Sequence, residues 1–221
     1  MVADFLILRF SILKTCFDIS YILSVISVQR PEKIVLSNSG KLSVNDISTL
    51  ENKCERLVVM DKGINISHGL PEHLTSDRVA SIIASRYLFS GKECTIFDFG
   101  ATLTIDKINA AGNYLGGNIS LGLRTRFKAL NRYSRNLPLV DYKDDVPDLG
   151  NSVESSLQAG VVSGILFEIN GYLSGDDGNI IVFTGGDANF FAKRMKNCIF
   201  VVCNLVLMGL AIVAFEYGKK D

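Results

Sequence analysis

The sequence predicts an α/β protein with mixed sheets flanked by helices, and three observations support this class. Short apolar runs typical of strands come first, and segments with a helical period then alternate with further strand-like runs. A polar stretch at Ser90-Gly91-Lys92 interrupts the pattern, so we expect an N-terminal lobe over residues 1–90 and a C-terminal lobe over residues 91–221. At 221 residues the chain is long enough to bury a substantial core.

The expected elements of the first lobe are short strands and two helices. Strands are predicted at residues 5–9, 12–17, 33–37 and 57–60, and helices at 44–54 and 76–87. Ser43 or Asn45 can cap the first helix, and Ser76 or Asp77 can start the second. The side chains expected to face the core are Ile47, Leu50 and Cys54 in the first helix and Val79, Ile82, Ile83 and Tyr87 in the second.

The second lobe starts with consecutive strands and continues with alternating helices and strands. Strands are predicted at residues 94–97, 101–108, 113–115, 179–183 and 199–203, and helices at 121–132, 153–172, 188–195 and 205–217. Asn151 or Ser152 can cap the long helix. Its expected apolar stripe is Val153, Leu157, Val161, Ile165 and Ile169, and that of the helix at 121–132 is Leu123, Phe127 and Leu130.

Charge and cysteine content argue against several classes of protein. Lys plus Arg and Asp plus Glu both number 23, so no basic excess attracts nucleic acid. The five cysteines are odd in number and lack CxxC spacing, which favours buried, reduced thiols in a cytoplasmic protein over a disulfide framework or a zinc site. The two histidines argue against a histidine-based metal centre.

Two apolar segments resemble targeting or membrane signals. Arg9, Lys14 and Asp18 interrupt residues 5–28, which argues against a signal peptide. Residues 199–215 carry no charge, but Asn204 divides them, and we expect a buried strand and a buried helix there instead of a membrane span.

Three turns combine glycine with polar side chains at the expected ends of strands: Asp98-Phe99-Gly100, residues 116–122 and Thr184-Gly185-Gly186-Asp187. Backbone N–H groups can hold phosphate oxygens, glycine allows close approach, and a carboxylate can bind a cation. Together the turns point to a nucleotide phosphotransferase. Taken singly, each has a simpler interpretation, as a turn former, a tight bend or a loop.

Ordered motifs extend this reading over a larger part of the chain. They are Leu74-Thr75-Ser76-Asp77-Arg78, Asp98-Phe99-Gly100-Ala101-Thr102-Leu103-Thr104, Gly116-Gly117-Asn118-Ile119-Ser120-Leu121-Gly122, Gly150-Asn151-Ser152-Val153-Glu154-Ser155 and Thr184-Gly185-Gly186-Asp187-Ala188. In order and spacing they are similar to the motifs Leu-Gly-x-Asp-Arg, Asp-x-Gly-Thr-x-x-Thr, Gly-Gly-x-Ile-x-Pro-Gly, Gly-x-x-Thr-x-x-Ala and the glycine-rich turn of one bacterial family. On these residues the chain resembles the type III pantothenate kinases.

The resemblance implies a fold, a reaction and partners. The fold is two ribonuclease H-like lobes of the actin-like ATPase superfamily. The reaction is phosphorylation of the terminal hydroxyl of pantothenate by ATP, the first step of coenzyme A synthesis. The implied assembly is a cytoplasmic homodimer that pairs through the second lobe and completes the pantothenate pocket between subunits, with no nucleic-acid or membrane partner.

The resemblance also implies roles for individual residues. Asp77 is the expected general base, and Arg78 the partner of the pantothenate carboxylate. Further expected substrate contacts are His68, Thr75, Ser76 and Ser152. Without the resemblance, Asp77 and Arg78 are better explained as a helix-capping acid and its solvated partner, and the shared order of the motifs reverses this preference. Arg124, Arg126 and Lys128 are expected to form a solvated helix face.

The expected nucleotide and cation ligands lie around the Asp98 turn. Asp98 is expected to bind a monovalent cation, K⁺ or NH₄⁺, and Mg²⁺ to enter with ATP. Gly100 and Ala101 are expected next to the ATP phosphates, with Ser11 and Lys14 as the remnants of a first phosphate loop.

Several positions depart from the family pattern. Residues 6–14 hold neither an acid nor a glycine where the family has Asp-x-Gly-Asn-Thr-x-x-Lys, and Arg9 lies near the place of the acid. Other departures are Thr75 for glycine, Ala101 for threonine, Leu121 for proline and His68 for tyrosine. Three readings follow: a working pantothenate kinase, a catalytically impaired relative that binds pantothenate or a partner, and a small membrane-associated protein.

Overall fold

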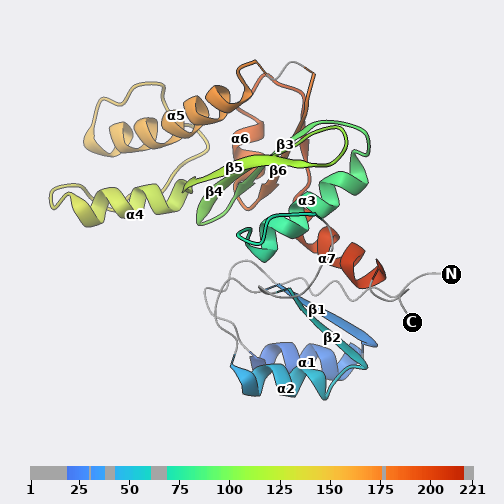
Figure 1. Cartoon of the computed structure of the whole chain (residues 1–221). Helices are drawn as coiled ribbons and strands as arrows, with labels where there is room; N and C mark the ends of the chain where they lie inside the picture. The colour runs from blue at the N-terminus through green and yellow to red at the C-terminus, as the bar shows by residue number, and fades with distance from the viewer. Residues whose placement is uncertain (1–18, 30, 38–42, 61–68, 176–177, 217–221) are drawn as a thin grey trace. The chain divides into compact units, whose positions relative to one another are not determined.

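The computed structural model describes residues 19–29, 31–37, 43–60, 69–175 and 178–216 (Figure 1). The strands predicted at residues 5–9 and 12–17 lie outside these ranges, as do Ser11, Lys14 and His68. The chain divides into two compact units, residues 1–87 with 205–221 and residues 88–204.

The first unit contains a parallel pair of strands joined by a helix. Its elements are α1 (Ile19–Gln29), β1 (Lys33–Ser37), α2 (Val44–Glu51), β2 (Arg56–Met60), α3 (Ser76–Leu88) and α7 (Leu205–Glu216). β1 pairs with β2 from Lys33 opposite Arg56 to Ser37 opposite Met60. The helix between them is the crossover that a parallel pair requires. Ser43 caps α2 in a reciprocal capping box with Asp46, which confirms one of the two predicted caps.

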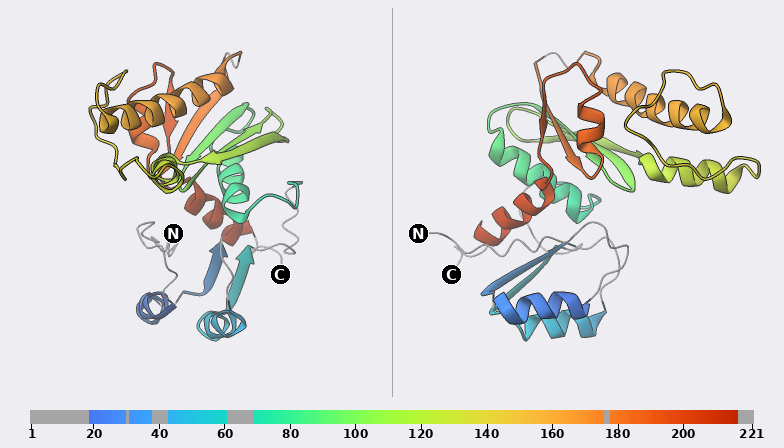
Figure 2. Two further views of the ribbon diagram at one scale, coloured as in Figure 1. Left: turned by 90° about the vertical axis from the view of Figure 1, so that its left-hand side faces the viewer. Right: turned by 180° about the vertical axis from the view of Figure 1, so that it is seen from behind.

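Helices cover both faces of this strand pair, because its residues alternate between two apolar clusters. α1 and α2 lie side by side against one face (Figure 2). That face contributes Ile34, Leu36, Leu57 and Val59 to a cluster with Ile22, Ile26, Leu50 and Cys54. The opposite face contributes Val35, Val58 and Met60 to a cluster with residues of α3 and α7. Both strands are therefore apolar at every position that faces a helix.

Close packing within the second cluster depends on a glycine of α7. A Cβ placed on Gly209 would lie 1.9 Å from the carbonyl oxygen of Ala80 in α3 and 2.5 Å from its carbonyl carbon. The two helix backbones therefore meet at this point, and any larger residue must push them apart.

The second unit is a five-stranded mixed sheet with helices packed on one face. Its elements are β3 (Cys94–Phe99), β4 (Thr102–Ile108), β5 (Tyr114–Leu121), α4 (Leu123–Tyr133), α5 (Val153–Leu173), β6 (Ile180–Gly185), α6 (Ala188–Ala192) and β7 (Ile199–Val201). The strand order is β5-β4-β3-β6-β7. β3–β4 and β4–β5 are antiparallel, whereas β3–β6 and β6–β7 are parallel. The predicted mixed α/β class is confirmed.

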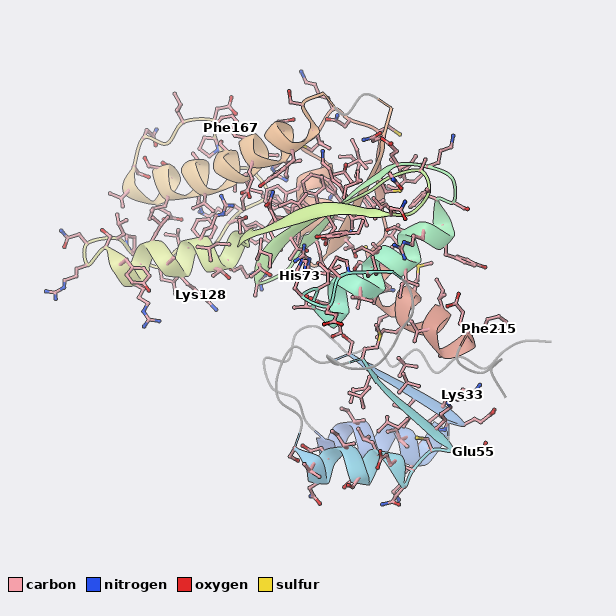
Figure 3. All side chains as sticks on the ribbon, viewed as in Figure 1. Lys33, Glu55, His73, Lys128, Phe167 and Phe215 are labelled. Atoms are coloured by element: carbon pink, nitrogen blue, oxygen red, sulfur yellow. The ribbon has the colours of Figure 1, made fainter. Side chains whose placement is uncertain are left out.

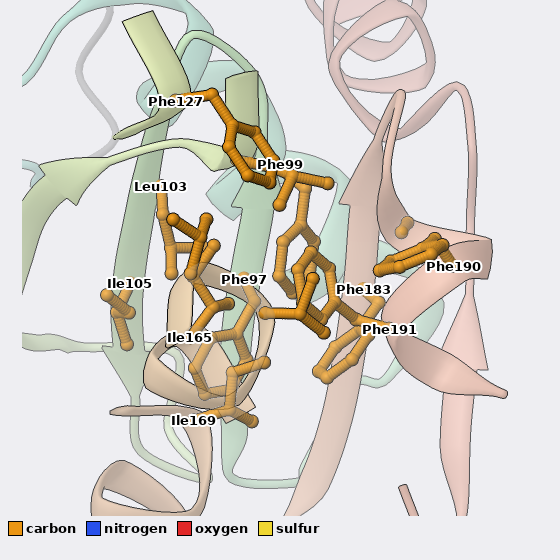
Figure 4. Packing of buried hydrophobic residues seen from close by; sticks show 14 of the residues in the cluster. Phe97, Phe99, Leu103, Ile105, Phe127, Ile165, Ile169, Phe183, Phe190 and Phe191 are labelled. Carbon is orange, nitrogen blue, oxygen red and sulfur yellow. The ribbon is translucent and has the colours of Figure 1, made fainter. Parts of the chain in front are cut away.

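Aromatic side chains of the central strands form the core of the second unit (Figure 4). Phe97 and Phe99 of β3 project to the same face, because they are two residues apart in a strand. Phe99 lies 4.8 Å from Phe183 and 5.0 Å from Phe191, measured between ring centroids. Leu123 and Phe127 of α4 and the stripe Leu157, Val161, Ile165 and Ile169 of α5 cover this face.

Three residues predicted to face the core are instead exposed. Tyr87 is 72% exposed, Leu130 37% and Val153 56%. All three lie in the first or last turn of their helices, which extend beyond the surface they cover. Helical periodicity predicts a face correctly, but it does not predict where along the helix the core ends.

The predicted turn at residues 116–122 is also wrong, because most of it is strand. β5 runs from Tyr114 to Leu121 and pairs with β4 over its length, with Thr104 opposite Ile119 and Thr102 opposite Leu121. The hydrogen bonds of the ladder outweigh the low strand propensity of Gly116 and Gly117.

The cysteines within the described ranges are free thiols. Cys94 is buried, and burial raises its pKa to about 11. Cys198 and Cys203 are exposed, so the prediction of buried thiols is wrong for these two. Among the described helices, none is both long and apolar enough to cross a membrane.

Replacing Gly209 by Ala tests the contact between α3 and α7. We expect Gly209→Ala to lower the free energy of unfolding by ~1–3 kcal/mol, because its methyl group overlaps backbone atoms that cannot rotate away. The matched control is Gly160→Ala in α5, where a Cβ meets no atom within 4 Å. That change should stabilise the protein by up to ~1 kcal/mol, since alanine is the better helix former. Chemical denaturation measures both, and equal effects would contradict the packing described.

Candidate functional site

The end of β3 places a carboxylate between two hydroxyl groups. Asp98 lies opposite Thr104 of β4 and Thr184 of β6 in the strand register. Residues directly opposite one another on neighbouring strands project to the same face of a sheet. The three side chains therefore share the face opposite the aromatic core. Thr104 and Thr184 are buried, whereas Asp98 is half-buried.

The turn after β6 presses directly onto this carboxylate. Gly185 has a φ of +89°, and a Cβ at this position would lie 2.5 Å from Asp98 Oδ1 and 2.6 Å from the carbonyl oxygen of Phe99. Both the backbone conformation and the lack of space require glycine. Asp187 then donates its backbone N–H to the same Phe99 oxygen over 3.4 Å. The first and third predicted turns are therefore in contact.

A tight hairpin continues the chain from Asp98. Gly100 donates its N–H to Thr102 O over 3.0 Å, and Ala101 lies exposed at the tip. Ala101 O accepts from the Gly122 N–H at 3.0 Å and from Thr125 Oγ1 at 2.6 Å. A Cβ on Gly122 would lie 2.0 Å from the carbonyl oxygen of Gly100, so this glycine is also required by close approach. The hairpin is thus fixed against the start of α4.

Asp77 and Arg78 lie in the first turn of α3, in the first unit. Thr75 O accepts the N–H of Val79 over 3.0 Å, which places Thr75 immediately before the helix. Ser76 Oγ lies 2.7 Å from Ser37 Oγ at the end of β1, which ties the start of the helix to the strand. A carboxylate in the first turn is stabilised by the helix dipole.

Ser152 lies at the N-terminus of α5. Its hydroxyl accepts the backbone N–H of Ser155, and the Ser155 hydroxyl accepts the N–H of Ser152 in return. Ser152 is exposed, so the capping contact leaves it accessible to a ligand. The predicted cap is confirmed for Ser152.

A group of polar side chains that the sequence did not predict surrounds Asp187. The Tyr142 hydroxyl donates to Asp187 Oδ1 over 3.0 Å, and the Arg124 guanidinium lies 5.9 Å from the centre of the Tyr142 ring. Burial raises the pKa of the Asp187 carboxyl, against the opposing effect of the Tyr142 hydrogen bond. Burial and the charge of Asp187 raise the pKa of Tyr142, and the hydrogen bond to Tyr142 raises that of Arg124.

The expectation that Arg124, Arg126 and Lys128 form a solvated helix face is wrong for Arg126 alone. Arg124 is exposed and contacts Tyr142, whereas Arg126 is half-buried and pairs with Glu168 of α5. Arg126 also donates from Nε to Leu121 O over 2.8 Å, so it joins the end of β5 to both helices. Lys128 is exposed as predicted (Figure 3).

The predicted site residues separate by unit. Asp98, Gly100 and Ala101 lie together in the second unit, and Gly185 joins them. Thr75, Ser76, Asp77 and Arg78 are consecutive in the first unit, and Ser152 belongs to the second. Within the described ranges, no group of three or more His, Cys, Asp or Glu side chains is arranged to hold a metal ion. The carboxylate and hydroxyl oxygens around Asp98 fit a hard cation better than a soft one.

Two solved structures are similar in fold to this chain. The chain resembles the crystal structure of a Campylobacter jejuni protein described as a conserved Baf family transcriptional activator, with a TM-score of 0.62 at 21% identity, covering 90% of this chain and 89% of the other. It also resembles the activator of the 2-hydroxyisocaproyl-CoA dehydratase from Clostridium difficile, solved with bound ADPNP, with a TM-score of 0.52 at 13% identity, covering 91% and 82%. At these identities the likeness shows a shared fold and nothing more.

Sequence relatives define the family to which the chain belongs. The model of the type III pantothenate kinase family matches residues 22–174. The type III pantothenate kinase of Cytophaga hutchinsonii is 34% identical over 209 residues, covering 89% of this chain and 86% of the relative. That of Phocaeicola vulgatus is 42% identical over 154 residues, covering 68% of this chain, and this match spans 63% of the relative. The chain belongs to the type III pantothenate kinase family.

Adjacent glycines in the turn after β6 allow a matched test of the Asp98 contact. Gly185→Ala should lower the free energy of unfolding by ~2 kcal/mol or more, because it combines a strained φ with overlap of Asp98 and Phe99. Gly186→Ala should change it by less than about 0.5 kcal/mol, since a Cβ there meets no atom within 4 Å. Urea unfolding measures both variants. Equal losses would show that the turn does not press onto the strand end.

Proposed function

We propose that this protein transfers a phosphoryl group from ATP to the terminal hydroxyl of pantothenate, the first step of coenzyme A synthesis. Family membership carries the proposal, because the match to Cytophaga hutchinsonii extends over 89% of the chain. The structure supports it with a glycine turn pressed onto a strand-end carboxylate, an arrangement suited to binding a cation and phosphate. The proposed location is the cytoplasm.

Asp98 is the proposed ligand of a monovalent cation, K⁺ or NH₄⁺. Its neighbours Thr104 and Thr184 supply hydroxyl oxygen atoms on the same face of the sheet. A cation at this point reduces repulsion between the Asp98 carboxylate and the phosphates of ATP. Gly100 and Ala101 lie exposed at the hairpin tip, where the absence of a side chain on Gly100 allows those phosphates to approach closely.

Asp77 is the proposed general base and Arg78 the partner of the substrate carboxylate. A carboxylate suits proton removal in phosphoryl transfer, because the loose transition state requires mainly positioning and charge stabilisation. The Ser76–Ser37 contact and the preceding turn fix the backbone of this segment. Thr75, Ser76 and the exposed hydroxyl of Ser152 are further proposed contacts of pantothenate.

The remaining proposed ligands lie outside the described residues. Ser11 and Lys14 are proposed to contact ATP, which brings Mg²⁺, and His68 to contact pantothenate. Lys14 is a point charge able to approach a phosphate, and Ser11 offers one hydroxyl donor.

A second candidate function is pantothenate or partner binding without efficient turnover. It is favoured by residues 6–14, which hold neither the acid nor the glycine of the family's first phosphate motif, and by Ala101, which lacks a hydroxyl donor. Loss of one well-placed donor typically lowers the rate by ~10²–10³. Calorimetric binding of pantothenate without ATP-dependent turnover would identify this case.

A coupled assay for ADP release that requires both ATP and pantothenate tests the kinase function. We expect turnover in the wild type, and a loss of ~10²–10⁴ in kcat for Asp77→Asn, because the amide cannot accept the hydroxyl proton. Glu72→Gln is the control, since Glu72 is exposed in the same segment. Turnover insensitive to Asp77→Asn would contradict the proposed mechanism.

We also propose that the protein forms a homodimer through its second unit. α4, α5 and the loop between them carry large exposed apolar side chains, a pattern typical of interaction surfaces. These are Leu130, Tyr133, Leu139, Leu149, Val153 and Phe167. Phe167 of α5 is 73% exposed (Figure 3).

Light scattering after size-exclusion chromatography tests the assembly. We expect the wild type to elute at twice the 24.2 kDa mass of the chain. Phe167→Glu should produce monomer, because a buried, unpaired carboxylate is costly at an interface. Lys92→Glu, at an exposed turn, is the control and should leave the mass unchanged. A monomeric wild type, or a dimeric Phe167→Glu variant, would contradict this interface.

A further inference from the structure

The loop between α4 and α5 is fastened to the second unit just before Ser152. Gln158 of α5 donates from Nε2 to the carbonyl oxygen of Asp141 over 2.8 Å, and Gln158 is only 4% exposed. Arg194, just after α6, donates to the carbonyl oxygen of Asp144 and to that of Phe190. These donors hold the backbone of residues 141–144 from two different helical segments.

Tyr142 is the central side chain of this attachment. Its ring packs edge-on against Phe190 of α6 with 4.6 Å between centroids, and its hydroxyl donates to Asp187. Phe190 is itself stacked under the Arg194 guanidinium, 3.6 Å from its ring centre. The loop is therefore anchored on the short segment from Asp187 to Arg194.

The far end of the loop is equally constrained. A Cβ on Gly150 would lie 2.1 Å from the backbone nitrogen of Ser156, so the loop closes directly onto the first turn of α5. Lys143 forms an exposed ion pair with Glu154 over 3.2 Å. Residues 141–144 therefore bridge the start of α5, which carries Ser152, to the segment from Asp187 to Arg194.

Asp187 connects this loop to the Asp98 turn. Its backbone N–H donates to Phe99 O, and it follows the Gly185 turn that presses onto Asp98. Its side chain accepts from Tyr142. One residue thus contacts the strand end through its backbone and the loop through its carboxylate.

We propose that Tyr142 and Asp187 are positioning residues, whose hydrogen bond holds the 141–152 loop, and with it Ser152, at a fixed place relative to the Asp98 turn. The expected effect on pantothenate binding rests on the proposed function, in which Ser152 contacts pantothenate. Loss of the hydrogen bond then weakens pantothenate binding without altering the Asp98 turn that serves ATP. Neither residue needs to touch the substrate.

Steady-state kinetics of Tyr142→Phe test the expected effect on pantothenate binding. This substitution removes one hydroxyl and keeps the ring. We expect the KM for pantothenate to rise about 3- to 10-fold, the usual effect of one hydrogen bond, while the KM for ATP stays within about twofold. Tyr87→Phe is the control, because Tyr87 is 72% exposed in the last turn of α3 and belongs neither to the loop nor to the proposed interface. Equal changes in both KM values, or none, would overturn the proposal.

Substitutions of Asp187 separate positioning from general destabilisation. Asp187→Asn keeps an acceptor for the Tyr142 hydroxyl and should retain the wild-type KM for pantothenate, whereas Asp187→Ala should match Tyr142→Phe. The double variant Tyr142→Phe/Asp187→Ala should be no worse than the worse single variant. Additive effects in the double variant would mean that the two residues act separately and would overturn the proposal.

Amide hydrogen exchange tests the loop independently of activity. Tyr142→Phe should accelerate exchange in residues 143–150, whereas Tyr87→Phe should leave it unchanged, whether or not the wild type turns over. Unchanged exchange would overturn the proposal. An inactive wild type that does not bind pantothenate, but whose loop exchange responds to Tyr142→Phe, would refute the proposed function and leave the positioning role of the pair supported.

Discussion

The second unit depends on the close approach of two strand ends, those of β3 and β6. The two strands are parallel neighbours, so Asp98-Phe99 and Thr184-Gly185 leave the sheet at the same edge. Their turns can touch only because Gly185 has no side chain and adopts a positive φ. This contact connects to the hairpin at Gly100 and to Asp187. The hydrogen bonds of Asp187 in turn connect it to the loop before Ser152. The position of any ligand-binding group at this edge of the sheet therefore depends on a contact between backbone segments.

The sequence predicts correctly those elements that show in a pattern of neighbouring residues. The strands at 33–37 and 57–60 are apolar at consecutive positions because helices cover both faces, and Ser152 caps α5 through residues three positions away. The turns at Asp98-Phe99-Gly100 and Thr184-Gly185-Gly186-Asp187 are predicted from the order and spacing of several motifs, because each turn alone is also explained as a simple bend or loop. Their mutual contact was not predicted, since it depends on which strands are neighbours in the sheet.

The features that the sequence did not predict depend on long-range contacts. α1 was missed because its β-branched and apolar residues favour strand as much as helix, and only the burial of Ile22 and Ile26 against β1 decides between them. β5 extends through Gly116 and Gly117 because β4 supplies a ladder for it. Arg126 and Tyr142 look like surface residues in the sequence, and their partners Glu168 and Asp187 lie more than forty positions away.

In the proposed function, Asp98 holds a monovalent cation beside the phosphates of ATP. The direct measurement is calorimetric titration of the protein with Mg²⁺ and ATP, in potassium chloride and in choline chloride of equal ionic strength. This role of Asp98 predicts tighter ATP binding in potassium, and a loss of that difference in Asp98→Asn, which keeps the shape of the side chain but removes its charge. Equal affinity in the two salts, or a potassium effect that persists in Asp98→Asn, would contradict it.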